Sequence, residues 1–141
     1  LIENDASGWY ESGPVRDVTI RNNQFIECGY NSGSNNYVIN INPQTHRLIP
    51  GYYVHSHIRI ENNIFKVYDY PLLSARSTNG LIFKGNTIIP SNLFKPGVKR
   101  AAFNLTACKN VSIEKNVFTN NEKPVINLVS MNSKDVKTDI K

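Results

Sequence analysis

Four segments of the chain repeat one arrangement of apolar and polar positions. Each reads turn residue, apolar, any, apolar, any, any, Asn, any, apolar, and the four copies cover residues 17–25, 57–65, 80–88 and 110–118. The three apolar positions coincide in every copy when the segments are aligned on Asn23, Asn63, Asn86 and Asn116. Alternating apolar residues indicate a strand with one buried face, and the asparagine predicts a tight corner after it.

A second set of alternating segments lies between these repeats, at residues 37–42, 71–77, 101–107 and 124–130. Their alternation places one apolar pair of each segment on a common face: Ile39 and Ile41, Leu73 and Ala75, Phe103 and Leu105, Ile126 and Leu128. Each repeating unit therefore contains at least two short strands.

These repeats predict a right-handed parallel β-helix of about four coils with partial coils at the ends. The aligned asparagines are 40, 23 and 30 residues apart, so loops of different length leave from fixed corners. Equivalent strands stack about 4.8 Å apart in such a solenoid. We expect Val18, Ile58, Leu81 and Val111 to form one buried row, and the four asparagines to form a ladder at the corner. A β-sandwich does not explain a register kept four times.

The two ends of the chain differ in character. Residues 1–129 are interpreted as coils from the C-terminal part of a larger β-helix, and residues 130–141 as a polar cap or tail around Val136. The chain starts with Leu1 inside an apolar segment, which suggests a cut from a longer protein with further N-terminal coils. A cut solenoid exposes a sheet edge, so self-association through that end is expected.

Composition and charge narrow the function classes. The 141 residues are 40% hydrophobic and carry a formal charge of +5. The basic residues are scattered without interleaved aromatics, which argues against nucleic acid as a partner. The short apolar runs argue against a membrane-spanning helix, and no nucleotide-binding or nucleophile-elbow motif occurs. No cofactor is expected.

The cysteines and histidines give no metal motif. Cys28 and Cys108 lie about three coils apart, beyond disulfide reach, and are expected to be buried free thiols. His55 and His57 stand at period-two spacing and are expected to share a face, with His57 at a solvated corner. No metal site is predicted.

The segment 4–14 carries the best candidate for carbohydrate chemistry. It contains Asp5 and Glu11 beside Trp9 and Tyr10, and Trp9 is the only tryptophan of the chain. An aromatic ring can stack on the apolar face of a sugar while carboxylates accept its hydroxyl hydrogen bonds. The alternative is that Trp9 packs over a coil edge.

A second long segment, residues 42–57, is rich in hydrogen-bonding and stacking groups. It carries His46, Arg47, Tyr52 and Tyr53, and we interpret it either as one wall of a cleft or as a packed decoration of the solenoid. Arg76 alternates away from the Leu73 face and is a further candidate for substrate contact.

The combined pattern resembles the C-terminal part of family 110 glycoside hydrolases, which are exo-acting α-1,3-galactosidases of gut Bacteroides and other bacteria. The resemblance covers residues 1–118, and residues 9–18, WYESGPVRDV, are its most specific part. It implies a right-handed parallel β-helix, a substrate with terminal α-linked galactose, and a secreted parent in the periplasm or outside the cell.

The resemblance also implies inverting hydrolysis by two carboxyl groups. The family's paired aspartates have no counterpart here, because no two aspartates are adjacent, so the catalytic residues are expected upstream of Leu1. Asp5 and Glu11 are weak catalytic candidates, and the chain alone is expected to be inactive. The alternatives are a carbohydrate-binding or lyase-type β-helix, and a structural surface or fibre solenoid.

Overall fold

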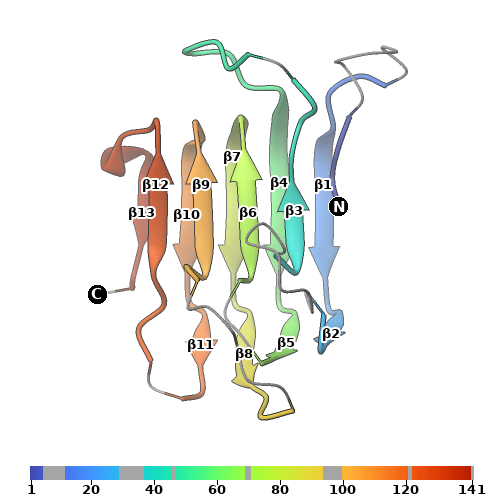
Figure 1. Ribbon diagram of the computed structural model, residues 1–141, viewed down its shortest axis with the longest axis vertical. Helices are drawn as coiled ribbons and strands as arrows, with labels where there is room; N and C mark the ends of the chain where they lie inside the picture. The colour runs from blue at the N-terminus through green and yellow to red at the C-terminus, as the bar shows by residue number, and fades with distance from the viewer. Residues whose placement is uncertain are drawn as a thin grey trace.

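The computed structural model describes residues 1–4, 12–28, 37–45, 47–68, 71–93, 100–120 and 122–140. Its strands form three sheets, here called the first, second and third sheet (Figure 1). The first sheet contains β1 (Arg16–Arg21), β4 (His55–Glu61), β7 (Thr78–Lys84), β10 (Lys109–Glu114) and β13 (Val136–Thr138). The second contains β2 (Gln24–Ile26), β5 (Ile64–Val67), β8 (Thr87–Pro90) and β11 (Val117–Phe118). The third contains β3 (Ile39–Ile41), β6 (Leu73–Arg76), β9 (Phe103–Thr106) and β12 (Ile126–Val129).

Every strand pair is parallel, and neighbouring strands come from successive coils. The chain passes through one strand of each sheet before it returns to the first sheet, so the fold is a parallel β-helix with three strands per coil. The register is the one that the repeats predict, since Val18 lies opposite Ile58, Ile58 opposite Leu81, and Leu81 opposite Val111. Within the described ranges, no helix has the length and apolar character needed to cross a bilayer.

The corners depend on residues in the left-handed backbone region, which short polar residues and glycine tolerate best. Such residues recur at equivalent positions of successive coils, and three of them are asparagines, Asn22, Asn62 and Asn110. Four first-sheet strands, β1, β4, β7 and β10, each contain one left-handed residue near their start: Asp17, His57, Gly80 and Asn110. The corner after each of these strands also holds a left-handed residue: Asn22, Asn62, Gly85 and Lys115.

The four aligned asparagines form one continuous ladder beside the second of these corners. The Oδ1 atom of Asn63 accepts hydrogen bonds from the main-chain N–H and the Nδ2 of Asn23, at 2.9 and 3.1 Å. The Oδ1 atom of Asn86 accepts from the main-chain N–H and the Nδ2 of Asn63 at 2.9 and 3.1 Å. The Oδ1 atom of Asn116 accepts from the same two groups of Asn86 at 3.0 and 3.1 Å. Each Nδ2 also donates to a main-chain carbonyl, so the amide side chain satisfies main-chain groups that the corner leaves unpaired.

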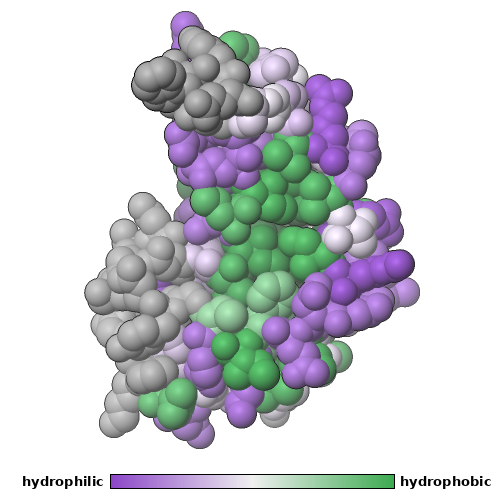
Figure 2. All heavy atoms as spheres, turned by 90° about the vertical axis from the view of Figure 1, so that its right-hand side faces the viewer, coloured by the Kyte–Doolittle hydropathy of each residue, from purple (hydrophilic) through white to green (hydrophobic). Residues whose placement is uncertain are grey.

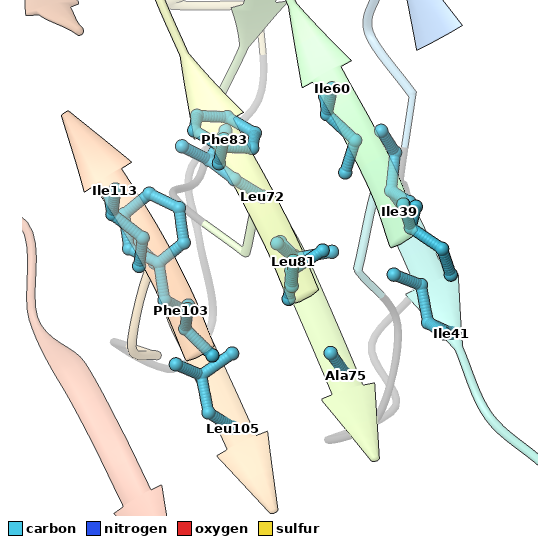
Figure 3. Packing of buried hydrophobic residues seen from close by; sticks show 14 of the residues in the cluster. Ile39, Ile41, Ile60, Leu72, Ala75, Leu81, Phe83, Phe103, Leu105 and Ile113 are labelled. Atoms are coloured by element: carbon cyan, nitrogen blue, oxygen red, sulfur yellow. The ribbon is translucent and has the colours of Figure 1, made fainter. Parts of the chain in front are cut away.

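The interior of the coils is filled by apolar side chains from all three sheets. Figure 3 shows members of this core from first- and third-sheet strands. Phenylalanine rings of neighbouring coils stack on one another, with centroids 4.7 Å apart for Phe25 and Phe65 and 5.5 Å apart for Phe65 and Phe83. Phe103 meets Phe83 edge to face at 5.1 Å. These packed side chains fill the interior of the coils, so a ligand that binds this fold must contact its outer surface or its loops.

The two ends of the solenoid are less completely covered. Val18 was expected to be buried but is only half-buried, because it lies in the first coil and β1 is the outermost strand of its sheet. At the other end, β13 pairs with β10 through Val111 and Val136, preceded by the short 3-10 helix η1 (Ser133–Asp135). The polar segment around Val136 therefore extends the first sheet by one strand.

The cysteines correct one expectation. Cys108 is buried, and burial raises the pKa of its thiol to about 11. Cys28 is exposed rather than buried, because it follows the corner at the end of β2, where Glu27 is left-handed and the chain turns away from the core.

Candidate functional site

Two long segments lead into first-sheet strands at one corner: residues 5–15, of which 12–15 are described, connect residues 2–4 to β1, and residues 42–54 connect β3 to β4. We call residues 5–15 the first excursion and residues 42–54 the second excursion. The same corner is tight in the next two coils, where Ser77 alone joins β6 to β7 and two residues join β9 to β10. Figure 1 shows the second excursion projecting beyond the end of β4.

The described ends of the two excursions lie side by side where they leave the solenoid. Ile2 bridges Ile41 in β3, and the Gln44 N–H donates to the Asn4 carbonyl at 3.3 Å. The Gln44 side-chain amide also donates to the Glu3 carboxylate. These bonds join the base of the first excursion to the base of the second.

The returning ends are joined by buried polar side chains. The Val15 N–H donates to Nδ1 of His55 at 3.1 Å, and the Ser56 N–H donates to the Val15 carbonyl at 3.2 Å. The Val54 N–H donates to Oγ of Ser77 at 3.1 Å. His55 is 0% exposed, and burial lowers the pKa of its imidazole while the Val15 contact raises it. A neutral imidazole therefore anchors the first excursion.

The sequence-predicted site residues are only partly described. Asp5, Trp9, Tyr10, Glu11 and His46 lie outside the described residues.

The structure describes four other candidates: Arg47, Tyr52 and the half-buried Tyr53 in the second excursion, and Arg76 in β6. Arg47 is exposed, and the Thr45 hydroxyl donates to its carbonyl at 3.1 Å. Tyr52 is 60% exposed. Arg76 ends β6 opposite Thr106, is half-buried, and immediately precedes Ser77.

The two histidines of β4 do not share a face, which corrects the expectation from their spacing. His55 points into the interior, whereas His57 is exposed and lies 3.3 Å from Asp17. His57 has a φ of 54°, and this left-handed residue interrupts the alternation of the strand. The described part of the chain holds no cluster of three or more His, Cys, Asp or Glu residues that could bind a metal ion.

Charged side chains on the outside of the first sheet alternate in sign along the coils. Arg21 lies opposite Glu61, Glu61 opposite Lys84, and Lys84 opposite Glu114. Lys137 contacts Glu114 at 2.9 Å, and this hydrogen bond lowers the pKa of the Glu114 carboxyl. Some of the scattered basic residues of the sequence therefore belong to a face of mixed charge.

Comparison with known proteins identifies the relatives of the chain. It is 46% identical over 144 residues to alpha-1,3-galactosidase A of Bacteroides fragilis, a match that covers 100% of this chain and 24% of that enzyme. The chain is similar over its whole length to part of an alpha-1,3-galactosidase. Alpha-1,3-galactosidase B of Bacteroides thetaiotaomicron is 43% identical over 122 residues, covering 82% of this chain and 19% of the relative.

Alpha-1,3-galactosidase B of Akkermansia muciniphila is 40% identical over 118 residues, covering 82% of this chain and 15% of the relative. No family model matches the chain. The resemblance to α-1,3-galactosidases is thus confirmed, and the chain spans about a quarter of the length of the first of these relatives.

Sequence reasoning missed His55 and Ser77 as anchors of this corner. A signal was present, because Ser77 stands where Ala107 stands in the next coil, and His55 stands in register with Thr78. Because buried polar side chains are nearly always hydrogen-bonded, a polar residue at an inward position of a repeat indicates a hydrogen-bond partner specific to that coil.

Proposed function

We propose that this chain forms part of an α-1,3-galactosidase that removes terminal α-linked galactose, with the two excursions at one side of the substrate. The observation that carries the proposal is the 46% identity along the whole chain to an enzyme of that name. The supporting geometry is the shared corner, where excursions from two successive coils are joined by hydrogen bonds.

In this proposal, Trp9 and Tyr10 stack on the sugar, and Arg47 and Arg76 donate hydrogen bonds to its hydroxyl groups. Inverting hydrolysis uses an acid and a water-activating base about 6.5–9.5 Å apart. Most of a relative's length lies outside the match, so we assign the catalytic pair to coils that precede this chain, in a protein secreted to the periplasm or beyond.

The test is an assay of this chain and of the Bacteroides fragilis enzyme on a disaccharide with terminal α-1,3-linked galactose. We expect turnover by the longer enzyme, no turnover by this chain, and weak binding by this chain in saturation-transfer NMR. Replacing Trp9 by Ala should abolish the binding. Turnover by this chain that disappears in Asp5→Asn or Glu11→Gln would overturn the assignment of the catalytic pair, and binding unaffected by Trp9→Ala would overturn the stacking role.

We also propose that the N-terminal end of the solenoid binds a second copy of the isolated chain. Figure 2 shows a broad apolar surface at this end, and β1 is the outermost strand of its sheet. Val18 and Ile20 are half-buried there, and no described residue donates to Oδ1 of Asn23. An unpaired strand edge beside apolar side chains favours pairing with another strand.

Sedimentation velocity over a range of concentrations tests this contact. We expect a concentration-dependent oligomer that Val18→Lys dissociates. Val125→Lys, a matched substitution at a 53% exposed position of the last coil, should leave the oligomer intact. A monomer at all concentrations would refute the proposal, as would equal effects of the two substitutions.

A further inference from the structure

Two buried side chains from the second and third coils hold the returning ends of both excursions. His55 begins β4 and receives the N–H of Val15, where the first excursion ends. Ser77 forms the tight corner before β7 and receives the N–H of Val54, where the second excursion ends. The two residues are connected through their main chains, because the His55 main-chain N–H donates to the Ser77 carbonyl at 3.1 Å.

The imidazole of His55 is suited to hold the first excursion only while it is neutral. Because Nδ1 accepts the Val15 N–H, the proton of the neutral ring is on Nε2, which has no hydrogen-bond partner. A second proton would have to enter at Nδ1, where it would face the Val15 N–H and break the contact. Burial opposes that protonation by lowering the pKa of the imidazole.

Among the residues that the structure describes, the charged side chains of the neighbouring strands point away from His55 or are exposed. Arg16 and Asp17 on β1 and His57 on β4 are exposed, and Arg76 on β6 alternates away from the core. Within the described part of the chain, burial lowers the pKa of His55 and the weaker effect of the Val15 contact raises it.

The Ser77 side chain makes two contacts with the second excursion. Its Oγ accepts the Val54 N–H at 3.1 Å and donates to the Tyr52 carbonyl at 3.5 Å. Ser77 is 1% exposed and has a left-handed φ of 49°. The equivalent corner of the next coil is Ala107, with the same φ of 49° and a direct connection in place of an excursion. The corner itself therefore does not require a serine.

We propose that His55 and Ser77 are positioning residues that fix the returning ends of the two excursions, at Val15 and Val54, beside one corner, and so influence the galactoside site. This role rests on the proposed function. The stacking of β4 on β7 does not depend on these side chains, since six registered residue pairs join the two strands through main-chain bonds. Thr78 and Ala107 take the corresponding places in the following coils. The histidine and the serine are thus tied to the excursions rather than to the solenoid.

Trp9 gives a direct signal for the first excursion, because it is the only tryptophan of the chain and belongs to that segment. We expect acrylamide quenching of its fluorescence to rise as the pH falls, with a midpoint below 6.5, the ordinary pKa of histidine. His55→Asn keeps an acceptor near the place of Nδ1 and cannot titrate, so it should keep the quenching of the parent chain at neutral pH and lose the transition. His55→Leu should give the high-quenching value at every pH.

Ser77→Ala tests the second excursion by amide hydrogen exchange. We expect loss of protection at the Val54 amide and retained protection in β4 and β7. Ser130→Ala is the matched control, since Ser130 is a left-handed corner residue with φ of 53° and should leave Val54 protected. These readouts use no substrate, so they distinguish a failure of the anchors from a failure of the proposed galactosidase function.

Two results would overturn the positioning role. One is a pH transition of Trp9 that persists in His55→Asn. The other is unchanged quenching in His55→Leu at neutral pH while the chain still melts cooperatively. Unchanged protection of Val54 in Ser77→Ala would remove Ser77 from the proposal.

Discussion

Replacing Asn86 by Ala should be among the most destabilising single changes in this chain, because the asparagine ladder passes through its side chain. Asn86 is 0% exposed. Its Oδ1 accepts the N–H and the Nδ2 of Asn63, and its Nδ2 donates to the Ile60 carbonyl and to Asn116. Alanine removes all four bonds and offers no substitute.

The cost follows from the groups that are left unpaired. The Asn63 N–H and the Ile60 carbonyl lose the partner that the ladder provides, and both residues are at most 1% exposed. Each stranded buried group costs about 1–3 kcal/mol, so we expect a loss of about 2–6 kcal/mol in the free energy of unfolding. The free energy of unfolding of an ordinary domain is about 5–15 kcal/mol, so the expected loss is a large part of it.

Asn23→Ala is the matched control for this prediction. Asn23 begins the ladder, is exposed, and its main-chain N–H still reaches Oδ1 of Asn63 after the substitution. No buried group is stranded, so the loss should be about 1 kcal/mol or less. Urea denaturation followed by circular dichroism measures both variants. Equal losses for Asn86→Ala and Asn23→Ala would refute the reasoning, since the ladder would then add nothing beyond a surface hydrogen bond.

Three further changes test other parts of the fold. Gly85→Ala should cost about 1–2 kcal/mol in a thermal melt, because φ is +66° and the new Cβ would lie 2.5 Å from Oδ1 of Asn62; an unchanged melting temperature would contradict this. Cys28 should react at once with a thiol reagent at neutral pH, whereas Cys108, with its raised pKa of about 11, should react only on unfolding; two fast thiols would show that the core opens. Ile60→Asp should abolish the folded far-UV spectrum, because the side chain is 0% exposed and the charge would have no partner; a cooperative melt near that of the parent chain would be inconsistent with the stacked core.

Much of the fold could be predicted because the repeats encode it locally. The template fixes which residues of each strand face inward, and alignment on the asparagines fixes the register, as in the row from Ile58 to Val111. The number of strands per coil was less visible. The strands β2, β5, β8 and β11 have only two to four residues each, so the sequence merges them with the corner before them.

The candidate site was less predictable, because it depends on corners rather than on strands. The sequence by itself determined the two long segments, their aromatic and acidic residues and their similarity to galactosidases. The tertiary structure alone decided that Val15 and Val54 return to one corner and are held by His55 and Ser77.

The tertiary structure also decided which neighbouring residues face the core and which face the solvent. A left-handed φ at His57 turns it outward and leaves His55 inside, so counting by twos along the strand fails there. A similar corner at Glu27 carries Cys28 out of the core, and the place of Val18 in the outermost strand leaves it half-buried. Alternation along the sequence predicts which residues face the core only in a regular strand. A residue with positive φ, or a strand at the end of the solenoid, changes the burial of a side chain while the apolar and polar pattern of the sequence stays the same.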